Sequence, residues 1–204
     1  VIPSETVLNE ESKDLDFRVE SNNNANMLFV DGGNNQVGIG TASMNSYYSK
    51  ELVVSAAAEG GITIVGGSSD SQYLMFADGT SGTQRYKGYV QYAHSSDTLI
   101  LATGANSVVN LSPTESVMNE QGLNRDFRVE SDSNTHMLFV DGGNDVVTFG
   151  TSTATLFNNS SDVYGASIDA DGLLQISRNN GAMLFLNRQN ANGEMIDLRV
   201  NGGQ

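Results

Sequence analysis

The chain of 204 residues contains no cysteine and no tryptophan, and only two of its residues are proline. Without cysteine neither a disulfide nor a thiolate–zinc site can form, so stability has to come from buried apolar side chains and from hydrogen bonds. No apolar run approaches the roughly 20 residues that a membrane-spanning helix needs. Disulfide scaffolds, zinc–thiolate domains and helical membrane anchors are therefore excluded for this sequence.

Positive charge is also scarce. Ten lysines and arginines stand against 24 aspartates and glutamates, which gives a formal net charge of −14. Binding to nucleic acid requires clustered basic side chains that neutralise phosphates, and adsorption to anionic lipid requires the same. We therefore predict no nucleic-acid partner and no insertion into a membrane. Because the acidic residues are spread along the chain, they indicate a solvated, self-repelling surface.

Turn-forming residues are plentiful instead. Glycine accounts for 22 residues, and glycine, asparagine and serine together separate short apolar runs. This pattern is typical of many short strands joined by tight turns. The sequence therefore predicts an all-β fold.

Residues 3–41 and 113–151 are two copies of one module. Every element of the second copy is offset by 110 residues without insertion, and 23 of the 39 aligned positions are identical. The shared strings include DFRVES at 16–21 and 126–131 and MLFVDGGN at 27–34 and 137–144. Repetition at a fixed period is typical of an array whose units complete their cores with neighbours. An active site usually occurs once per chain, so the duplication favours a structural role.

Alternation within the module predicts which side chains are buried. In residues 16–20 apolar and charged residues alternate, which indicates a strand with one buried face. The predicted core residues are Phe17, Val19, Phe127 and Val129, and the residues predicted to face solvent or pair across strands are Arg18, Glu20, Arg128 and Glu130.

Two further patterns in the module predict close packing. Residues 27–30 are apolar on both faces, which predicts a strand covered on both sides. Residues 37–40 alternate a branched side chain with glycine, and this alternation indicates another backbone passing close by. Either the same chain or a second copy of it can provide that backbone.

Four modules are predicted: the first repeat at 3–41, a central β module at 42–112, the second repeat at 113–151 and an antiparallel meander at 152–204. Central strands are predicted at 52–54, 62–65, 73–76, 89–94 and 99–101, with an Asp-Gly turn at 77–80. Meander strands are predicted at 173–176, 183–186 and 195–200, joined through Asn-Gly turns. Residues 49–58 are the one candidate for a helix.

No arrangement of side chains predicts catalysis or a bound cofactor. His136 stands where the first copy has Asn26, so we interpret it as a turn residue. Two histidines do not make a metal motif, and no pattern selects a carboxylate pair for glycoside cleavage. The Asp-rich turns at 31–34, 141–144 and 169–172 offer oxygen ligands without full calcium-loop spacing, so tight turns are favoured over a cation. We predict no enzyme, no cofactor and no metal site.

Tyrosines of the central module provide the candidate recognition site. They can form a surface on which carbohydrate stacks, whereas period-two tyrosine in a strand is also typical of sheet packing. The histidine beside them is otherwise interpreted as a surface residue of a hairpin. The candidate receptor-binding residues are Tyr86, Tyr89, Tyr92 and His94.

The string DFRVES–x5–MLFVDGGN–x2–VGIGT, at 16–41, resembles the repeats of phage tail-fibre and related virion fibre proteins of marine phages. Residues 76–92 and 176–188 resemble parts of the same proteins, and the likeness covers most of 7–200. VGIGT is the most specific of these motifs. The resemblance implies an elongated fibre on the virion surface, an intertwined homotrimeric β-prism or β-helix that works in host attachment. The implied partners are further copies of the chain, other virion proteins and a host surface glycan.

The sequence departs from this family in two places. Shafts of this kind often precede a self-cleaving chaperone domain that nucleates the trimer, and no segment within residues 1–204 resembles one. In the second copy Thr148–Phe149 replaces Gly38–Ile39, which predicts a looser backbone approach there. Two functions remain: a structural fibre of a virion tail or capsid, and a non-viral extracellular adhesin stalk or glycan-binding module.

Overall fold

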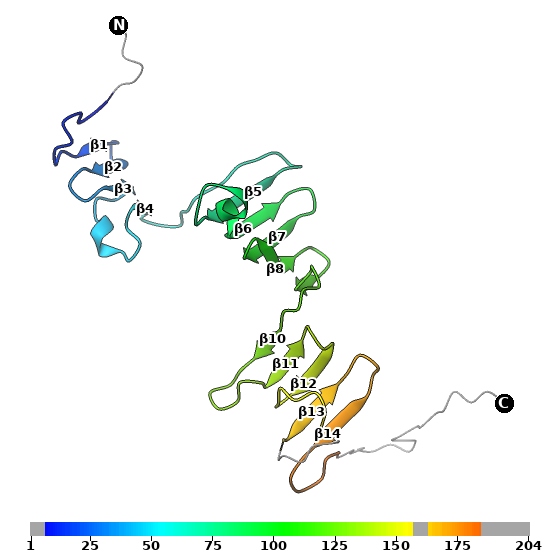
Figure 1. Ribbon diagram of the computed structural model, residues 1–204. Coiled ribbons are helices and arrows are strands. Elements are labelled where there is room, and N and C mark those ends of the chain that lie inside the picture. Colours follow the sequence, from blue (N-terminus) through cyan, green and yellow to red (C-terminus); the bar gives the residue numbers. More distant parts are fainter. Residues whose placement is uncertain (1–6, 157–162, 185–204) are drawn as a thin grey trace, which may run out of the picture. The chain divides into compact units, whose positions relative to one another are not determined.

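The computed structural model describes residues 7–156 and 163–184, and these residues form three β-sheets (Figure 1). The chain divides into two compact units, Val1–Gly66 with one sheet and Gly67–Gln204 with two. Helical structure within the described ranges is confined to two short 3-10 helices, η1 (Met44–Ser46) and η2 (Gly82–Tyr86). The predicted all-β class is confirmed. The described residues form open sheets, with no closed barrel or solenoid among them.

The sheet of the first unit contains four strands in the order β1-β2-β3-β4. Their bounds are β1 Phe17–Val19, β2 Leu28–Asp31, β3 Gln36–Ile39 and β4 Leu52–Val54. The first three strands pair antiparallel, whereas β3 and β4 run parallel. The carboxylate of Asp31 closes the β2–β3 turn by accepting hydrogen bonds from the backbone N–H of Asn34 at 2.8 Å and its Nδ2 at 3.0 Å. This turn had been expected from the sequence DGGN.

The sheet built on the second copy contains five antiparallel strands in the order β10-β11-β12-β13-β14. Their bounds are β10 Phe127–Val129, β11 Leu138–Asp141, β12 Val146–Phe149, β13 Gly165–Ile168 and β14 Leu174–Ser177. The first two strands repeat the register of the first copy, since Phe127 faces Val140 as Phe17 faces Val30. The copies diverge after their third strand, because β12 continues into an antiparallel neighbour and β3 into a parallel one.

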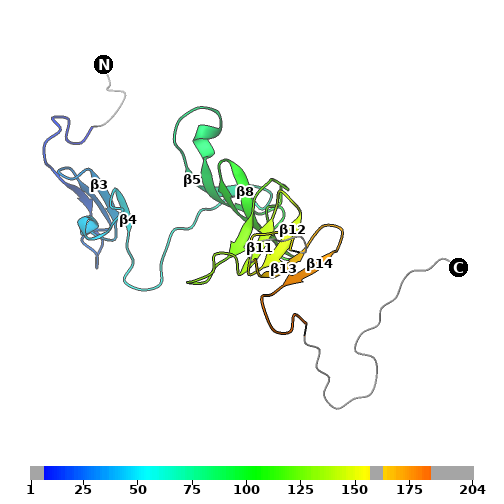
Figure 2. The same ribbon diagram turned by 60° about the horizontal axis from the view of Figure 1, so that its bottom comes forward.

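The central sheet contains five antiparallel strands in the order β5-β6-β7-β8-β9. Their bounds are β5 Ser71–Phe76, β6 Gly88–Ala93, β7 Thr98–Thr103, β8 Asn106–Leu111 and β9 Ser116–Met118. Figures 1 and 2 show its strands side by side, as in the other two sheets. The β6–β7 hairpin forms as predicted. The expected tight turn after β5 is instead a longer connection that carries η2, with the N–H of Asp78 donating to the carbonyl of Gln84 at 3.0 Å.

The glycine alternation in β3 reflects a close approach within the same chain. A Cβ on Gly38 would overlap the carbonyl oxygen of Thr41 and the sulfur of the fully buried Met44. A Cβ on Gly40, whose φ is +78°, would overlap the carbonyl oxygen of Ser55. The neighbouring backbone therefore belongs to the same chain, and the alternation by itself does not require a second copy.

The second copy uses the same position differently. Thr148 stands in place of Gly38, and its hydroxyl donates a hydrogen bond to the carbonyl oxygen of Thr151. Thr148 is 1% exposed, so the side chain fills the space that glycine leaves in the first copy. The backbone has withdrawn enough to admit a Cβ, in agreement with the looser approach expected there.

Burial of the repeated strand differs from the prediction. Phe17 is 41% exposed and Phe127 is 37% exposed, and Val19 and Val129 are exposed as well. The prediction that these four residues lie in a core is therefore wrong for a single chain. The charged residues between them do face solvent, and Arg18 pairs with Glu20 at 2.7 Å. The same ion pair joins Arg128 and Glu130 at 2.7 Å.

Two predicted secondary-structure elements do not form. Residues 62–65 are not a strand, and Val65 is 84% exposed. Residues 49–58 contain β4 and no helix. Strands β8, β9 and β13 were not predicted. In the meander, residues 183–184 lie outside any strand, and residues 185–186 and 195–200 fall outside the described residues.

Sheet boundaries differ from the predicted module boundaries. β4, from the central module 42–112, completes the sheet of the first copy, and β9, from the second copy 113–151, completes the central sheet. β13 and β14, from the meander 152–204, extend the sheet of the second copy. The physical reason is that the outer strand of a sheet presents unpaired N–H and C=O groups, and the adjoining chain segment pairs with them.

Replacing Gly38 by alanine should destabilise the first sheet. The added methyl group meets backbone and a buried sulfur that cannot move freely, so we expect the free energy of unfolding to fall by about 1–3 kcal/mol. Amide hydrogen exchange in β2 and β3 would measure the loss. Gly61→Ala is the matched control, since nothing lies within 4 Å of its Cβ position. Equal protection in the two variants would contradict the close approach.

Candidate interaction surface

The four residues predicted to bind a receptor lie on or beside β6, but the sheet divides them. Tyr89 and Tyr92 are three positions apart on one strand, and side chains alternate between faces, so they point to opposite sides. The ring of Tyr92 packs edge-on against His94 at 5.0 Å between centroids. Tyr89 packs instead against Tyr73 of β5 at 5.9 Å, and Tyr86 ends η2. Of the predicted set, the structure brings together Tyr92 and His94.

Tyr92 is also tied to the turn of the β6–β7 hairpin. Its hydroxyl donates a hydrogen bond to Oδ1 of Asp97 at 3.3 Å. Partial burial raises the pKa of Tyr92, and the negative charge of Asp97 raises it further. A half-exposed aromatic ring beside an imidazole and a carboxylate can stack on a sugar ring and hydrogen-bond its hydroxyls.

A larger surface lies on one face of the central sheet. We use the word ladder for a row of residues that pair directly across successive strands, so that their side chains lie on the same face. One ladder crosses all five strands and is apolar throughout: Leu74, Val90, Leu101, Val109 and Met118. Each of these side chains is partly or largely exposed, Leu74 by 56%. The next row along this face contains Tyr92, Leu99 and Leu111.

The sheet of the second copy carries two apolar ladders on one face. One consists of Phe127, Val140, Val147, Ile168 and Leu174, and the other of Val129, Leu138, Phe149, Ala166 and Ile176. None of these ten side chains is buried in the single chain. The first unit repeats the arrangement with Phe17, Val30, Val37 and Leu52. Val19, Leu28, Ile39 and Val54 lie beside them on that face.

The opposite faces are more polar, and in the two repeated sheets they are covered. In the second copy Thr148, Ser167 and Gln175 form one ladder under the segment 151–156. Ser167 Oγ donates to the carbonyl of Ala154 at 2.7 Å, and the N–H of Leu156 donates to Gln175 Oε1 at 2.8 Å. These are hydrogen bonds of buried groups, so the chain buries a mixed face, which also carries Phe139 and Val146, and exposes an apolar one.

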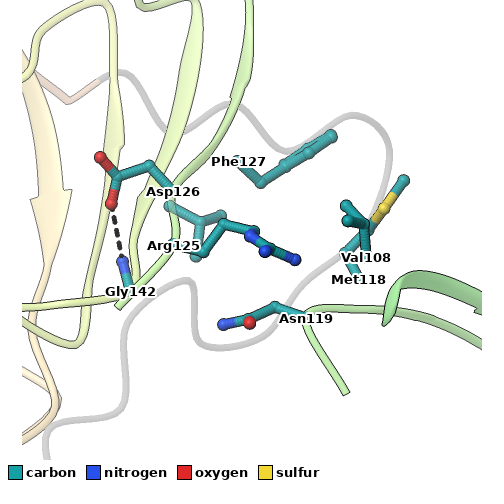
Figure 3. Close-up of a pocket in the computed structure, with 8 residues that line it drawn as sticks. Val108, Met118, Asn119, Arg125, Asp126, Phe127 and Gly142 are labelled. Carbon is teal, nitrogen blue, oxygen red and sulfur yellow. Dashed lines mark hydrogen bonds between the residues drawn. The ribbon is translucent and has the colours of Figure 1, made fainter. Parts of the chain in front are cut away.

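The module also repeats a cavity at the outer edge of its sheet (Figure 3). In the second copy it has a volume of about 220 Å³ and is lined by Met118, Phe127 and Val140, with Val108 contributed by β8. In the first copy the equivalent cavity, about 490 Å³, is lined by Leu8, Phe17 and Val30. Each lies beside the apolar ladder that begins at its phenylalanine.

Two substitutions distinguish the two cavities, since Met118 stands where the first copy has Leu8 and Arg125 where it has Leu15. The Nη1 of Arg125 donates a hydrogen bond to the carbonyl oxygen of Ser107, near the start of β8, at 3.1 Å. In both copies an aspartate accepts a hydrogen bond from the turn that follows the second strand of the module. Asp126 Oδ1 accepts from the N–H of Gly142 at 3.2 Å, and Asp16 Oδ1 accepts from that of Gly32 at 3.1 Å. The cavities contain no pair of groups arranged for acid–base chemistry.

Metal ligation and membrane spanning find no support in the described part of the chain. No group of three or more histidine, aspartate or glutamate side chains converges among residues 7–156 and 163–184. No helix in those ranges has the length and hydropathy needed to cross a bilayer. His136 lies in a turn, as predicted, with its ring edge-on to Phe139 at 5.0 Å.

The apolar ladders were missed by sequence reasoning, although their signal is present. Apolar residues flank a polar one in 90–92 and 109–111, which indicates one apolar face, whereas 74–76 and 99–101 are apolar at every position. Alternation cannot say whether that face is covered by the same chain. Only the pairing of the strands shows that these faces join into one surface and remain exposed.

Comparison with known proteins returns no relative: no family model matches the chain, and neither does a curated protein or a solved structure. The function is therefore argued from the surfaces described above.

The duplicated aspartate turns predict a shared response to acid. Hydrogen bonds, above all from the side-chain amides of Asn34 and Asn144, lower the pKa of Asp31 and Asp141. A carboxylate whose pKa falls on folding stabilises the fold above its ordinary pKa, near ~3.9, and this contribution is lost as the pH falls through the lowered value. We expect NMR titration to place both carboxyls below ordinary aspartate. Asn34→Ala and Asn144→Ala should return them toward it, whereas Asn23→Ala should not; equal titration in all variants would contradict the assignment.

Proposed function

We propose that this chain is a structural fibre protein of a virion, part of a tail or capsid fibre, that forms a homotrimeric shaft and contributes to attachment at the host surface. The observation that carries the proposal is that each of the three sheets leaves a continuous apolar ladder uncovered in a single chain. Apolar surface on this scale marks a site of association. A chain whose sheets all have this property is suited to assembly along its whole described length.

The duplicated module supports a structural role. Its two copies fold into the same three-stranded arrangement, with the same aspartate turn and the same exposed phenylalanine. A repeated unit that presents the same apolar face twice adds length without adding a new specificity. Together with the family resemblance of the VGIGT repeats, this favours an elongated, intertwined trimer of the β-prism or β-helix type.

The distribution of charge supports the same proposal. Acidic side chains of the turns and strand ends are exposed, while the ladders contain no charged residue. Three chains with −14 each carry −42, so assembly has to overcome electrostatic repulsion that dissolved salt screens. Such a surface keeps a particle-borne fibre soluble once its apolar faces are buried.

Attachment is assigned to the parts outside the duplicated module. Tyr92 and His94 form the one cluster of the predicted receptor residues, at the β6–β7 hairpin, and Tyr86 and Tyr89 lie elsewhere on the same sheet. A host surface glycan is the receptor class that an aromatic ring with adjacent hydrogen-bonding groups suits best. A non-viral extracellular adhesin stalk would use the same chemistry and is the alternative.

Native mass tests the homotrimer. Light scattering or sedimentation equilibrium at micromolar concentration should give about three times the chain mass of 21.7 kDa. Raising the ionic strength should strengthen association, because it screens repulsion between acidic chains. A folded monomer at all these concentrations would refute the trimer. Antibody labelling of the source particle in electron microscopy would separate a virion fibre, labelled on the tail or capsid, from an adhesin labelled on a cell surface.

Binding without catalysis is expected at the hairpin. Purified protein incubated with host surface polysaccharide should retain the glycan at its original length, and Tyr92→Ala should weaken retention because it removes the ring that packs on His94. Tyr48→Ala is the control, since Tyr48 is also exposed but lies in the first unit. Release of shortened glycan would show an enzyme, and equal retention by both variants would exclude Tyr92 as a contact.

A further inference from the structure

The composition of the apolar ladders points to a specific way of covering them. We propose that each sheet packs its ladder face against the same sheet of neighbouring copies of this chain, in register, so that identical residues meet near a common axis. This inference rests on the proposed homotrimer and adds which surfaces meet, and in which order. In the central sheet the packed row runs from Leu74 to Met118, and the row of Tyr92, at the β6–β7 hairpin end of that face, stays open to a ligand. The loop-covered faces of the two repeated sheets point outward.

The area of the ladder faces favours a second copy of this chain as the partner. A strand occupies about 4.8 Å of sheet width and successive residues on one face lie about 7 Å apart, so each ladder face covers only about 300 Å². A stable interface buries about 800 Å² on each partner. One face alone is too small, whereas the packed rows of the three sheets together reach about 800 Å². A partner that binds all three must carry matching faces in the same order, and a second copy of the chain does so by construction.

The chemistry of the ladder faces favours packing between identical copies. The central residues of the ladders are the aliphatic side chains of Val37, Leu101 and Val147, with no charge beside them in their rows. Identical aliphatic side chains can meet at a symmetry axis without a repulsive pairing, which like charges cannot. On the opposite face of the repeated sheets, Arg18 and Arg128 occupy the first position of the row. Copies packed through that face would bring like charges together.

The covering segments of the repeated sheets are not available to cover the apolar faces of those sheets. In the repeated sheets the segments that could do so, 41–46 and 151–156, are held on the opposite side. Gln36 Nε2 donates to Asn45 Oδ1 at 2.9 Å in the first copy, and Ser167 Oγ donates to Ala154 in the second. The covering segments are thereby fixed to the polar faces, and the apolar faces stay free for a neighbouring copy.

The absence of cysteine makes a direct test possible. Leu101→Cys places one thiol at the middle of the central ladder, and Ile100→Cys places one on the next residue of the same strand, facing the other way. Both are made in the full chain and oxidised under native conditions. A disulfide needs Cβ atoms about 3.5–4.5 Å apart, so only residues that meet their own copies will link. We expect covalent dimers from Leu101→Cys, with one unpaired thiol per trimer, and none from Ile100→Cys.

Charge substitutions test the two repeated faces with matched controls. Val19→Asp and Val129→Asp put a carboxylate on the ladder face, while Arg18→Asp and Arg128→Asp alter charge at the neighbouring residue on the other face. All four positions are exposed in the single chain, so the fold should tolerate each change. The ladder variants should raise the concentration at which the oligomer dissociates by about 10-fold or more, because a charge would be buried, and the controls should not.

The outcomes separate this inference from the proposed function. If the wild type is trimeric but Leu101→Cys and Ile100→Cys cross-link equally, or neither does, the in-register packing is wrong and the trimer stands. If the wild type is an oligomer of another number and Leu101→Cys alone cross-links, the packing stands and the trimer is wrong. A wild type that stays monomeric overturns both.

Discussion

The structure depends on the inverted burial of its sheets. A sheet must bury one face, and in most antiparallel sheets that is the apolar face. Here Thr148, Ser167 and Gln175 are buried beneath a loop of the same chain, while Phe127, Val147 and Leu174 on the other face are not. Burying polar groups is tolerable because each finds a hydrogen-bond partner, such as the carbonyl of Ala154. The larger hydrophobic contribution is left for contacts that a single chain does not make.

In the proposed trimer, this arrangement ties the folding of each chain to its association with other copies. Among the described residues, the largest side chains that are fully buried within one chain are Met44, Thr148 and Ser167. Met44 belongs to the covering segment of the first copy, and Thr148 and Ser167 lie under that of the second. Such loops fix the strands of each repeated sheet locally, so a chain can present its ladders before it meets a partner. Stability then depends on protein concentration in the way expected for oligomers whose subunits expose apolar surface. In the proposed trimer, repulsion between the acidic turns outside the ladders opposes association of chains whose faces are not aligned.

The sequence predicts local structure well where backbone chemistry is decisive. DGGN forms the expected turn in both copies, because its aspartate accepts the N–H groups of the turn, and the β6–β7 hairpin lies where Tyr89–His94 and Leu99–Leu101 placed it. Prediction from the sequence fails where strands from distant segments of the chain pair with one another. Alternation assigned Phe17 and Arg18 to opposite faces correctly, but it could not show that Phe17 remains 41% exposed. The candidate receptor residues are divided between the two faces for a related reason, since proximity in sequence does not place Tyr89 and Tyr92 on one face.

The strands of all three sheets are short, from three to six residues, and the sheets widen by placing further strands beside them. A protein of this design can gain or lose a hairpin without changing the length of any strand that remains. The first copy ends its sheet with a parallel strand and the second continues it with two antiparallel ones, although their first three strands agree. Duplication and later change at the edge strand thus leave the established part of each sheet undisturbed. The width of a sheet in such a chain can therefore change during evolution in steps of one strand, about 4.8 Å each.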